Sequence, residues 1–179
     1  GFEHQMGSWS PAEHRIAFTN VKAGIKDVIT ILRLDDRRDE HVIAVRGSNQ
    51  MDPAFSPDGK WIAYASEGDS GESVLQLYLE PFPPTGAKYR LTRDGGEMPV
   101  WSRDGRRLFY RVPNFEGVPN FEGLMSAAVD LNPFPHVTER VGIPVDGLAT
   151  DTTFAVSPGR DILVVIDGIS ASRRRTSDR

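Results

Sequence analysis

One short phrase recurs four times along the chain, and it constrains the possible folds more than any other feature. Each copy combines a bulky apolar residue, a serine and turn-forming residues, and each is followed directly by a short apolar segment. The copies begin at Trp9, Phe55, Trp101 and Val156. The first three lie at a constant spacing of 46 residues. A fixed period of this length indicates an array of similar units rather than one irregular globule.

The repeating unit contains four predicted strands separated by turns. In the second unit these strands are Pro53–Ser56, Trp61–Ala65, Leu75–Leu79 and Lys88–Thr92. Between the first two, Pro57 presets φ for a turn and Gly59 accepts the left-handed conformation that closes it. Four-stranded units with this period are typical of the blades of a β-propeller. The sequence therefore predicts an all-β propeller of antiparallel four-stranded blades.

The predicted ring of blades is incomplete. We expect blades at about residues 7–46, 53–92 and 99–141, half a blade at 153–166, and a polar, basic tail at 167–179. About three and a half blades fall short of the usual minimum of four, and an unfinished sheet leaves edges that favour pairing. Three arrangements stay open: a fragment of a larger propeller, an open arc, or a homodimer that completes one ring. We favour completion by a partner or a second copy over the fragment.

The spacing between the third and fourth copies is longer because of a tandem duplication. Val112–Gly117 is repeated at once as Val118–Gly123, which lengthens the loop between two predicted strands. Loops tolerate such insertions because closure entropy rises slowly with length. The duplication is therefore explained by neutral drift, and the alternative is that Phe115 and Phe121 form an exposed contact site.

The second unit resembles a known repeat. Pro53–Tyr64 resembles the TolB-like propeller repeat, a WD40-like repeat of the PD40 type built around Pro-x-aromatic-Ser-Pro-Asp-Gly-Lys. Leu77–Met125 is similar to a narrower group, the C-terminal TolB-like propellers of bacterial serine/threonine kinase-associated proteins, and Phe154–Pro158 resembles their last blade. The resemblance implies a scaffold for protein interaction or sensing in a bacterium, in the periplasm or another extracytoplasmic compartment.

Two copies of the phrase depart from this repeat. The first turn, Pro11–His14, lacks the Asp-Gly pair, and so does the fourth, Pro158–Asp161. Where glycine is missing from the left-handed position, we expect a strained or differently shaped turn.

Composition excludes several function classes. The net charge of −4 provides no general attraction for nucleic acid or anionic membranes. The 179 residues include no cysteine, which excludes disulfides, a cysteine nucleophile and thiolate metal sites. No apolar run of membrane-spanning length is present, so membrane insertion is not expected.

Motifs for catalysis, cofactors or metals are weak. Gly68–Gly71 reads Gly-Asp-Ser-Gly, but the four histidines lie outside any motif, and a serine nucleophile needs a histidine base. The acidic run Asp35–Glu40 contains two arginines and is explained by a solvated turn. Asp58 and Asp104 recur at one turn position, where capping their own turn is the simplest role. We therefore predict no catalytic residue, no cofactor and no metal site.

The predicted working surface consists of the loops that join an outer strand to the next inner strand. These loops open onto one face around the propeller axis, and they are acidic and polar. The candidate residues there are Asn49, Gln50, Asp52, Asp94, Glu97, Met98 and Asp151. Such a surface suits a basic protein or peptide partner.

The predicted function is a non-catalytic protein-interaction or sensing module, and two alternatives stay open. One is an accessory propeller of a prolyl-oligopeptidase-like hydrolase. The other is a small-ligand binder that uses the central channel of the propeller.

Overall fold

The computed structural model describes residues 3–10, 14–21, 24–35, 39–43, 48–68, 74–112, 123–143, 153–156 and 163–166. Every regular element within these ranges is a β-strand. The predicted tail at 167–179 and most of the tandem duplication lie outside the described residues.

The strands form blades in chain order. Blade 1 comprises β1 (Glu3–Ser10), β2 (Arg15–Val21), β3 (Val28–Arg33) and β4 (Asp39–Ile43). Blade 2 comprises β5 (Gln50–Phe55), β6 (Trp61–Ser66), β7 (Gln76–Pro81) and β8 (Tyr89–Arg90). Blade 3 comprises β9 (Glu97–Trp101), β10 (Arg107–Val112), β11 (Gly123–Asp130) and β12 (His136–Ile143). A terminal hairpin follows, formed by β13 (Thr153–Val156) and β14 (Leu163–Ile166).

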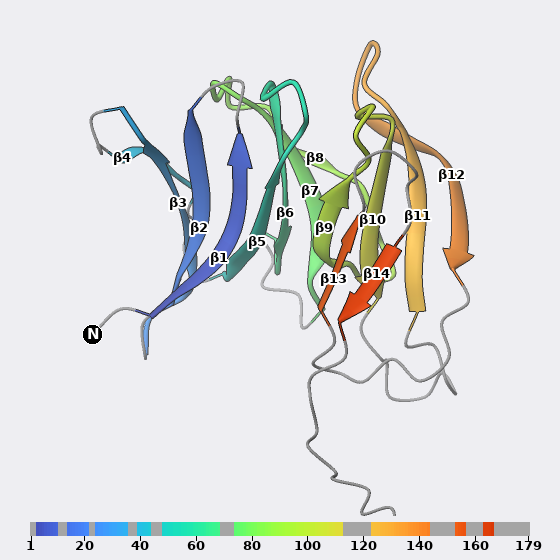
Figure 1. Ribbon diagram of the computed structural model, residues 1–179, viewed down its shortest axis with the longest axis horizontal. Coiled ribbons are helices and arrows are strands. Elements are labelled where there is room, and N and C mark those ends of the chain that lie inside the picture. The colour runs from blue at the N-terminus through green and yellow to red at the C-terminus, as the bar shows by residue number, and fades with distance from the viewer. Residues whose placement is uncertain are drawn as a thin grey trace, which may run out of the picture.

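The blades stand side by side and form an open array, as Figure 1 shows from β1 in blue to β12 in orange. Within each blade, strands that follow one another in the sequence pair antiparallel. The inner strands β1, β5, β9 and β13 connect the units, because β5 contacts β1, β9 contacts β5, and β13 contacts β9. This architecture confirms the predicted all-β fold of four-stranded antiparallel blades, arranged as a partial propeller.

The hydrophobic core is divided among the interfaces between neighbouring blades. Between blades 1 and 2 it comprises Ala17, Ile29, Ile31, Ile43, Phe55, Ile62, Tyr64, Tyr78 and Phe82. Between blades 2 and 3 one cluster comprises Ala54, Ala63, Leu79, Trp101, Leu108 and Val129, and a second comprises Ala65, Leu77, Tyr110 and Ala127. Between blade 3 and the terminal hairpin the buried residues are Phe109, Leu124 and Phe154. Each sheet is thus kept from water by its neighbours, which couples their stabilities.

The recurrent aromatic position behaves differently in different blades. The sequence predicts core packing for Trp9, Phe55 and Trp101 alike. Phe55 and Trp101 confirm this, with 6% and 7% of their surface exposed. The prediction is wrong for Trp9, which is 63% exposed. This aromatic position packs against the preceding blade, and blade 1 has no described blade before it.

Two copies of the recurrent phrase form the same hydrogen-bonded turn. Ser56 Oγ donates to Asp58 Oδ1 over 2.6 Å, and this carboxylate also accepts the Lys60 N–H over 3.1 Å. In the next blade Ser102 Oγ donates to Asp104 Oδ1 over 2.7 Å, and the following N–H donor again lies at 3.1 Å. Both aspartates therefore cap their own turns, as the sequence predicted.

The glycine of the phrase closes these turns in the left-handed region, with φ of 71° at Gly59 and 70° at Gly105. In the first copy, which lacks Asp-Gly, His14 takes a left-handed φ of 50° instead. Ser10, which occupies the serine position there, has a buried hydroxyl with no hydrogen-bond partner among the described residues. Apart from His14, the turns of the first and fourth copies lie outside the described residues, so the expected change in their shape stays a prediction.

The inner strands begin earlier than predicted. The prediction began two of them at Pro53 and Pro99, whereas β5 begins at Gln50 and β9 at Glu97. Both strands, and β1 as well, contain a shift of register against their neighbour, which marks a β-bulge. A bulge accommodates proline because the ladder is already interrupted there. The strand therefore continues through residues that the sequence assigned to a loop.

Candidate interaction surface

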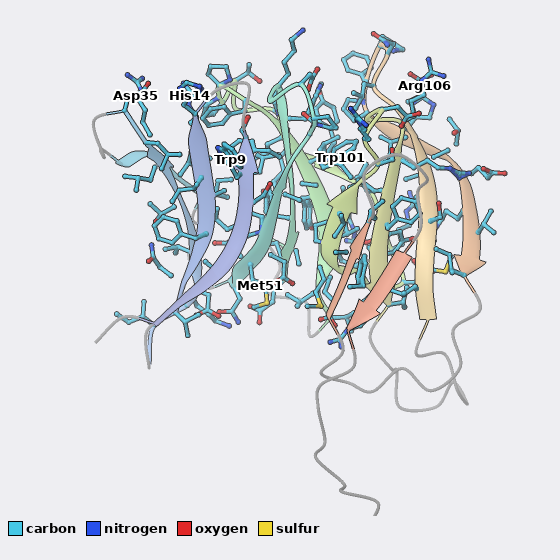
Figure 2. The ribbon with its side chains drawn as sticks, viewed as in Figure 1. Trp9, His14, Asp35, Met51, Trp101 and Arg106 are labelled. Carbon is cyan, nitrogen blue, oxygen red and sulfur yellow. The ribbon has the colours of Figure 1, made fainter. Side chains whose placement is uncertain are left out.

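The blades present two different edges. The Ser-Pro-Asp-Gly turns lie along one edge, which we call the turn face. The described residues that precede β5 and β9, 48–49 and 91–96, lie along the opposite edge, which we call the loop face. Figure 2 shows His14 and Arg106 on the turn face at the top and Met51 towards the loop face at the bottom. The predicted contact residues belong to the loop face.

Asp52 and Met98 occupy equivalent bulge positions in β5 and β9. Both adopt left-handed backbone conformations, with φ of 55° and 52°. The Asp52 N–H donates to Thr19 Oγ1 over 3.2 Å, and Asp52 Oδ2 accepts the Met98 N–H over 3.1 Å. Each bulge thus satisfies its backbone N–H with a side chain of the preceding blade. These two hydrogen bonds link blade 1 to blade 2 and blade 2 to blade 3.

The carboxylate of Asp52 lies in an unfavourable electrostatic environment. Burial raises its pKa, and the Glu97 carboxylate raises it further, whereas the Met98 N–H and Arg111 oppose the shift. Glu97 itself forms an ion pair with Arg111, which faces it across the β9–β10 ladder. Both side chains of this pair are mostly buried, at 13% and 19% exposure. Asp52 therefore stands beside a pair whose charges largely compensate each other.

Asn49 is half-buried and bonds to residues of two blades. Its Oδ1 accepts the Asp27 N–H over 3.0 Å, and its Nδ2 donates to Glu67 Oε1 over 2.8 Å. Lys26 Nζ donates to the other oxygen of Glu67 over 2.9 Å. Burial alone would raise the pKa of Glu67, but the bonds from Lys26 and Asn49 lower it below its usual value. Burial and the Glu67 charge raise the pKa of Asp27.

Among the predicted residues that the structure describes, Asp94 is the most accessible, with 61% of its side chain exposed. Its Oδ1 accepts a hydrogen bond from Arg140 over 2.9 Å, and Arg140 Nε also donates to the Tyr110 hydroxyl over 2.9 Å. Burial would raise the pKa of Asp94, but this arginine holds it below its usual value. The pair joins the loop before blade 3 to the outer strand of that blade.

Of the four remaining predicted residues, one has a buried side chain and three lie outside the described residues. Gln50 is fully buried, and its Nε2 donates to the Ser48 carbonyl oxygen over 3.0 Å. It therefore lies beneath the loop face. Asp151, Phe115 and Phe121 lie outside the described residues.

The structure thus brings Asp52, Glu97 and Met98 together on adjacent inner strands, with Asn49 and Asp94 on flanking loops. Their partners include Glu67, Arg111 and Arg140, none of which was among the predicted residues. Only the cross-strand register could have indicated one of them, because Arg111 is the ladder partner of Glu97. The others come from different strands or blades.

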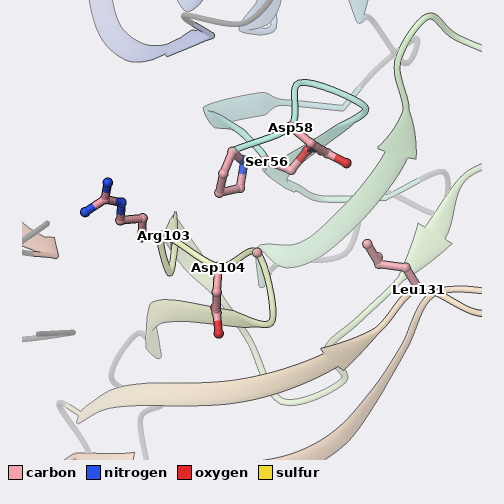
Figure 3. A pocket seen from close by; sticks show the side chains of 7 residues that line it. Ser56, Asp58, Arg103, Asp104 and Leu131 are labelled. Atoms are coloured by element: carbon pink, nitrogen blue, oxygen red, sulfur yellow. Dashed lines mark hydrogen bonds between the residues drawn. The ribbon is translucent and has the colours of Figure 1, made fainter. Parts of the chain in front are cut away.

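Two cavities lie elsewhere. One of about 370 Å³ opens on the turn face between the turns of blades 2 and 3, where Asp58, Asp104, Arg103 and Leu131 line it (Figure 3). Another of about 380 Å³ runs along the inner strands, past Trp9, Pro53, Pro99 and Trp101. The aspartates in the first cavity are already engaged by their own turns.

The described residues contain no helix that could span a membrane. Within the same ranges, no three histidine, aspartate or glutamate side chains are grouped so that they could hold a metal ion.

Comparison with known proteins identifies the architecture. The sequence matches no family model and no curated protein. The β-propeller domain of the Trilobed protease from Pyrococcus furiosus matches in structure with a TM-score of 0.62 at 19% identity, over 92% of this chain and 48% of that one. A putative TolB from Agrobacterium tumefaciens matches with a TM-score of 0.57 at 15% identity, over 78% and 50%. The chain has the fold of a TolB-like β-propeller.

Other matches to this TolB-like propeller include a peptidase. The acylaminoacyl peptidase of Pyrococcus horikoshii matches with a TM-score of 0.56 at 17% identity, over 87% of this chain and 26% of that one. This chain spans about half the length of the putative TolB chain and of the Trilobed protease propeller domain. The finer resemblance to kinase-associated propellers stays a prediction.

Proposed function

We propose that this propeller is a non-catalytic protein-interaction module that binds a basic peptide or protein segment through its loop face. The observation that carries the proposal is the pair of left-handed residues at one repeated position, Asp52 and Met98. Such conformations cost about 1–3 kcal/mol at non-glycine residues and cluster at binding and switch sites. Their recurrence in adjacent blades, at the same end of the inner strands, supports a binding role for that end.

The charges on this face support a basic ligand. Asp94 and Glu97 are paired with arginines, so they contribute little net charge. Asp27 and Asp52 have raised pKa values, which means that their ionised forms lack sufficient compensation in the free protein. A ligand cation placed beside them would supply that compensation and favour binding.

The positions of the described histidine side chains support the non-catalytic part of the proposal. His14 Nδ1 lies 3.4 Å from Asp35 Oδ1 on the turn face, and His136 Nδ1 lies 2.9 Å from the Phe134 carbonyl oxygen. A nucleophilic serine would need a histidine base within hydrogen-bond reach. Turnover of small peptide esters by the purified chain, above that of the heat-unfolded chain, would contradict this assignment.

The binding proposal is tested by selecting displayed random peptides on the immobilised chain. The loop-face variant carries Asp27→Asn and Asp52→Asn, which remove the two insufficiently compensated charges and keep the side-chain shapes. The matched control carries Asp58→Asn and Asp104→Asn, the same change on the turn face. Selected peptides should be rich in lysine and arginine and should lose about tenfold or more in affinity for the loop-face variant.

Affinities are measured by calorimetry on variants whose melting temperatures have been recorded. Peptides that bind both double variants as tightly as the unaltered chain would refute the proposed surface. Loss of binding confined to the turn-face control would assign the function to the opposite edge. A neutral small molecule that raises the melting temperature more than any peptide would favour a ligand-binding role instead.

A further inference from the structure

The interface between blades 2 and 3 has two complementary sides. On one side Trp101 projects from blade 3, and its indole Nε1–H donates to the Ala54 carbonyl oxygen of blade 2 over 3.2 Å. On the other side Ala54 pairs with Ala63 across the β5–β6 ladder, and both lie in the cluster that buries the indole. Each of these three residues is at most 7% exposed. A tryptophan on one sheet thus fits against small residues on the next.

The first blade presents the tryptophan side of such an interface with no described blade in front of it. Trp9 stands at the position of Trp101 and is 63% exposed. On the same face of the sheet, Ile16 is the ladder partner of both Trp9 and Leu32, and both aliphatic residues are only half-buried. These three residues define the front face of blade 1.

The terminal hairpin presents the small-residue side. Ala155 precedes the fourth copy of the phrase, just as Ala54 precedes the second, and it is exposed. It pairs with Val164 across the β13–β14 ladder, so a larger residue stands there at the position that Ala63 occupies in blade 2. Within the described residues, Trp9 and Ala155 therefore repeat the two partners of the contact between Trp101 and Ala54.

We propose that a second copy of this chain docks head to tail, with Trp9 of each copy seated over Ala155 of the other. The two contacts are equivalent, so two copies close one ring. One copy spans 48% of the solved Trilobed protease propeller domain, so two copies would have about the length of that domain. Tryptophans that are buried on association are common energetic centres of interfaces. The assembly does not depend on the ligand of the loop face.

The test is the solution mass of the full 179-residue chain by light scattering over a concentration series. The unaltered chain should pass from monomer to dimer as its concentration rises. Trp9→Ala and Ala155→Arg should each weaken dimer formation by about 30-fold or more. Phe134→Ala is the matched control, because this aromatic is 64% exposed on the turn-face side of blade 3 and should leave the mass unchanged.

Mixing the two variants separates head-to-tail docking from other contacts. Trp9→Ala retains Ala155, and Ala155→Arg retains Trp9, so a mixed pair keeps one intact contact and should associate more tightly than either variant alone. Circular dichroism verifies that each variant folds, and Ala155→Leu replaces the arginine variant should that one not fold.

Three results would overturn the proposal. One is a monomer at every concentration. Another is a dimer that Trp9→Ala weakens but the Ala155 variants do not, since that pattern indicates contact between two front faces. The third is a mass that grows beyond two copies, because a closed ring ends at two.

Discussion

Truncating the two tryptophans of the recurrent phrase should have very different effects on folding, although they occupy the same position in their blades. Trp101→Ala removes a side chain that is 7% exposed and loses the bond from its indole N–H to the Ala54 carbonyl. Trp9→Ala removes a side chain that is 63% exposed. The same substitution at the same position of the repeat thus reports the contribution of the neighbouring blade.

The expected magnitudes follow from burial. Truncation of a buried tryptophan to alanine typically costs about 3–5 kcal/mol, and we expect about 4 kcal/mol for Trp101. Trp9 buries much less surface, and the expected cost is roughly 1 kcal/mol. For a domain of this size the two values correspond to falls in melting temperature of about 10 °C and about 3 °C.

The assay is urea denaturation followed by far-ultraviolet circular dichroism, at concentrations low enough that the chain is monomeric by light scattering. Trp101→Phe separates the hydrogen bond from the ring, and it should retain most of the stability that Trp101→Ala loses. Equal losses for Trp9→Ala and Trp101→Ala in the monomer would refute the reasoning, because burial by the preceding blade would then not determine the energy.

Three further changes test other parts of the structure. Gly7→Ala should destabilise the fold by about 1–3 kcal/mol, because the new Cβ would lie 2.3 Å from the Ala17 carbonyl oxygen. Gly142→Ala is the control: its Cβ would have its nearest contact at 3.8 Å, and it should be nearly neutral in the same urea titration. Asp52→Asn should raise stability at neutral pH, because burial raises the pKa of Asp52 in the folded chain. The unaltered chain therefore loses stability as pH rises from 3.8 through the folded-state pKa. Thermal melts should show that the variant is more stable than the unaltered chain at pH 7 but not at pH 3. The hydrogen bond from Ser102 lowers the pKa of Asp104. The contribution of this carboxylate to stability is therefore complete above pH 3.8 and is lost as pH falls through the folded-state pKa. Asp104→Asn should lose less stability on acidification than the unaltered chain, and parallel pH profiles would contradict this.

The fold could be predicted because its determinants are local and repeated. The serine and aspartate of the phrase bond to each other within one turn, as at Ser56 and Asp58, and glycine supplies the left-handed residue. These interactions span a few residues, so a single sequence displays both partners. The period then shows that the same unit recurs, and only the propeller blade combines four strands with this length.

The surface could be predicted only in outline, because the partners of its residues lie in other strands and blades. The sequence placed Asn49 and Asp94 on loops of one face, but Asn49 bonds to residues of two blades and Asp94 pairs with Arg140. Gln50 follows Asn49 directly and is buried. Which polar residues a fold uses internally depends on tertiary contacts, and alternation along one strand does not reveal it.

The exposed Trp9 illustrates the same limit for the core. It occupies the same position of the recurrent phrase as the buried Trp101, and burial was therefore expected. Burial at this position is provided by the sheet before it, which is a property of the array and not of the repeat.

Because the core lies between blades and not within them, the array can lengthen without being redesigned. A copy of blade 2 would carry Phe55 for the blade before it and Ala54 and Ala63 for the blade after it, so it would fit beside the original. Such a chain can gain or lose length in steps of one whole repeat, whereas a partial repeat leaves two mismatched faces. Modular growth of this kind would preserve every existing contact while changing the curvature and diameter of the assembly.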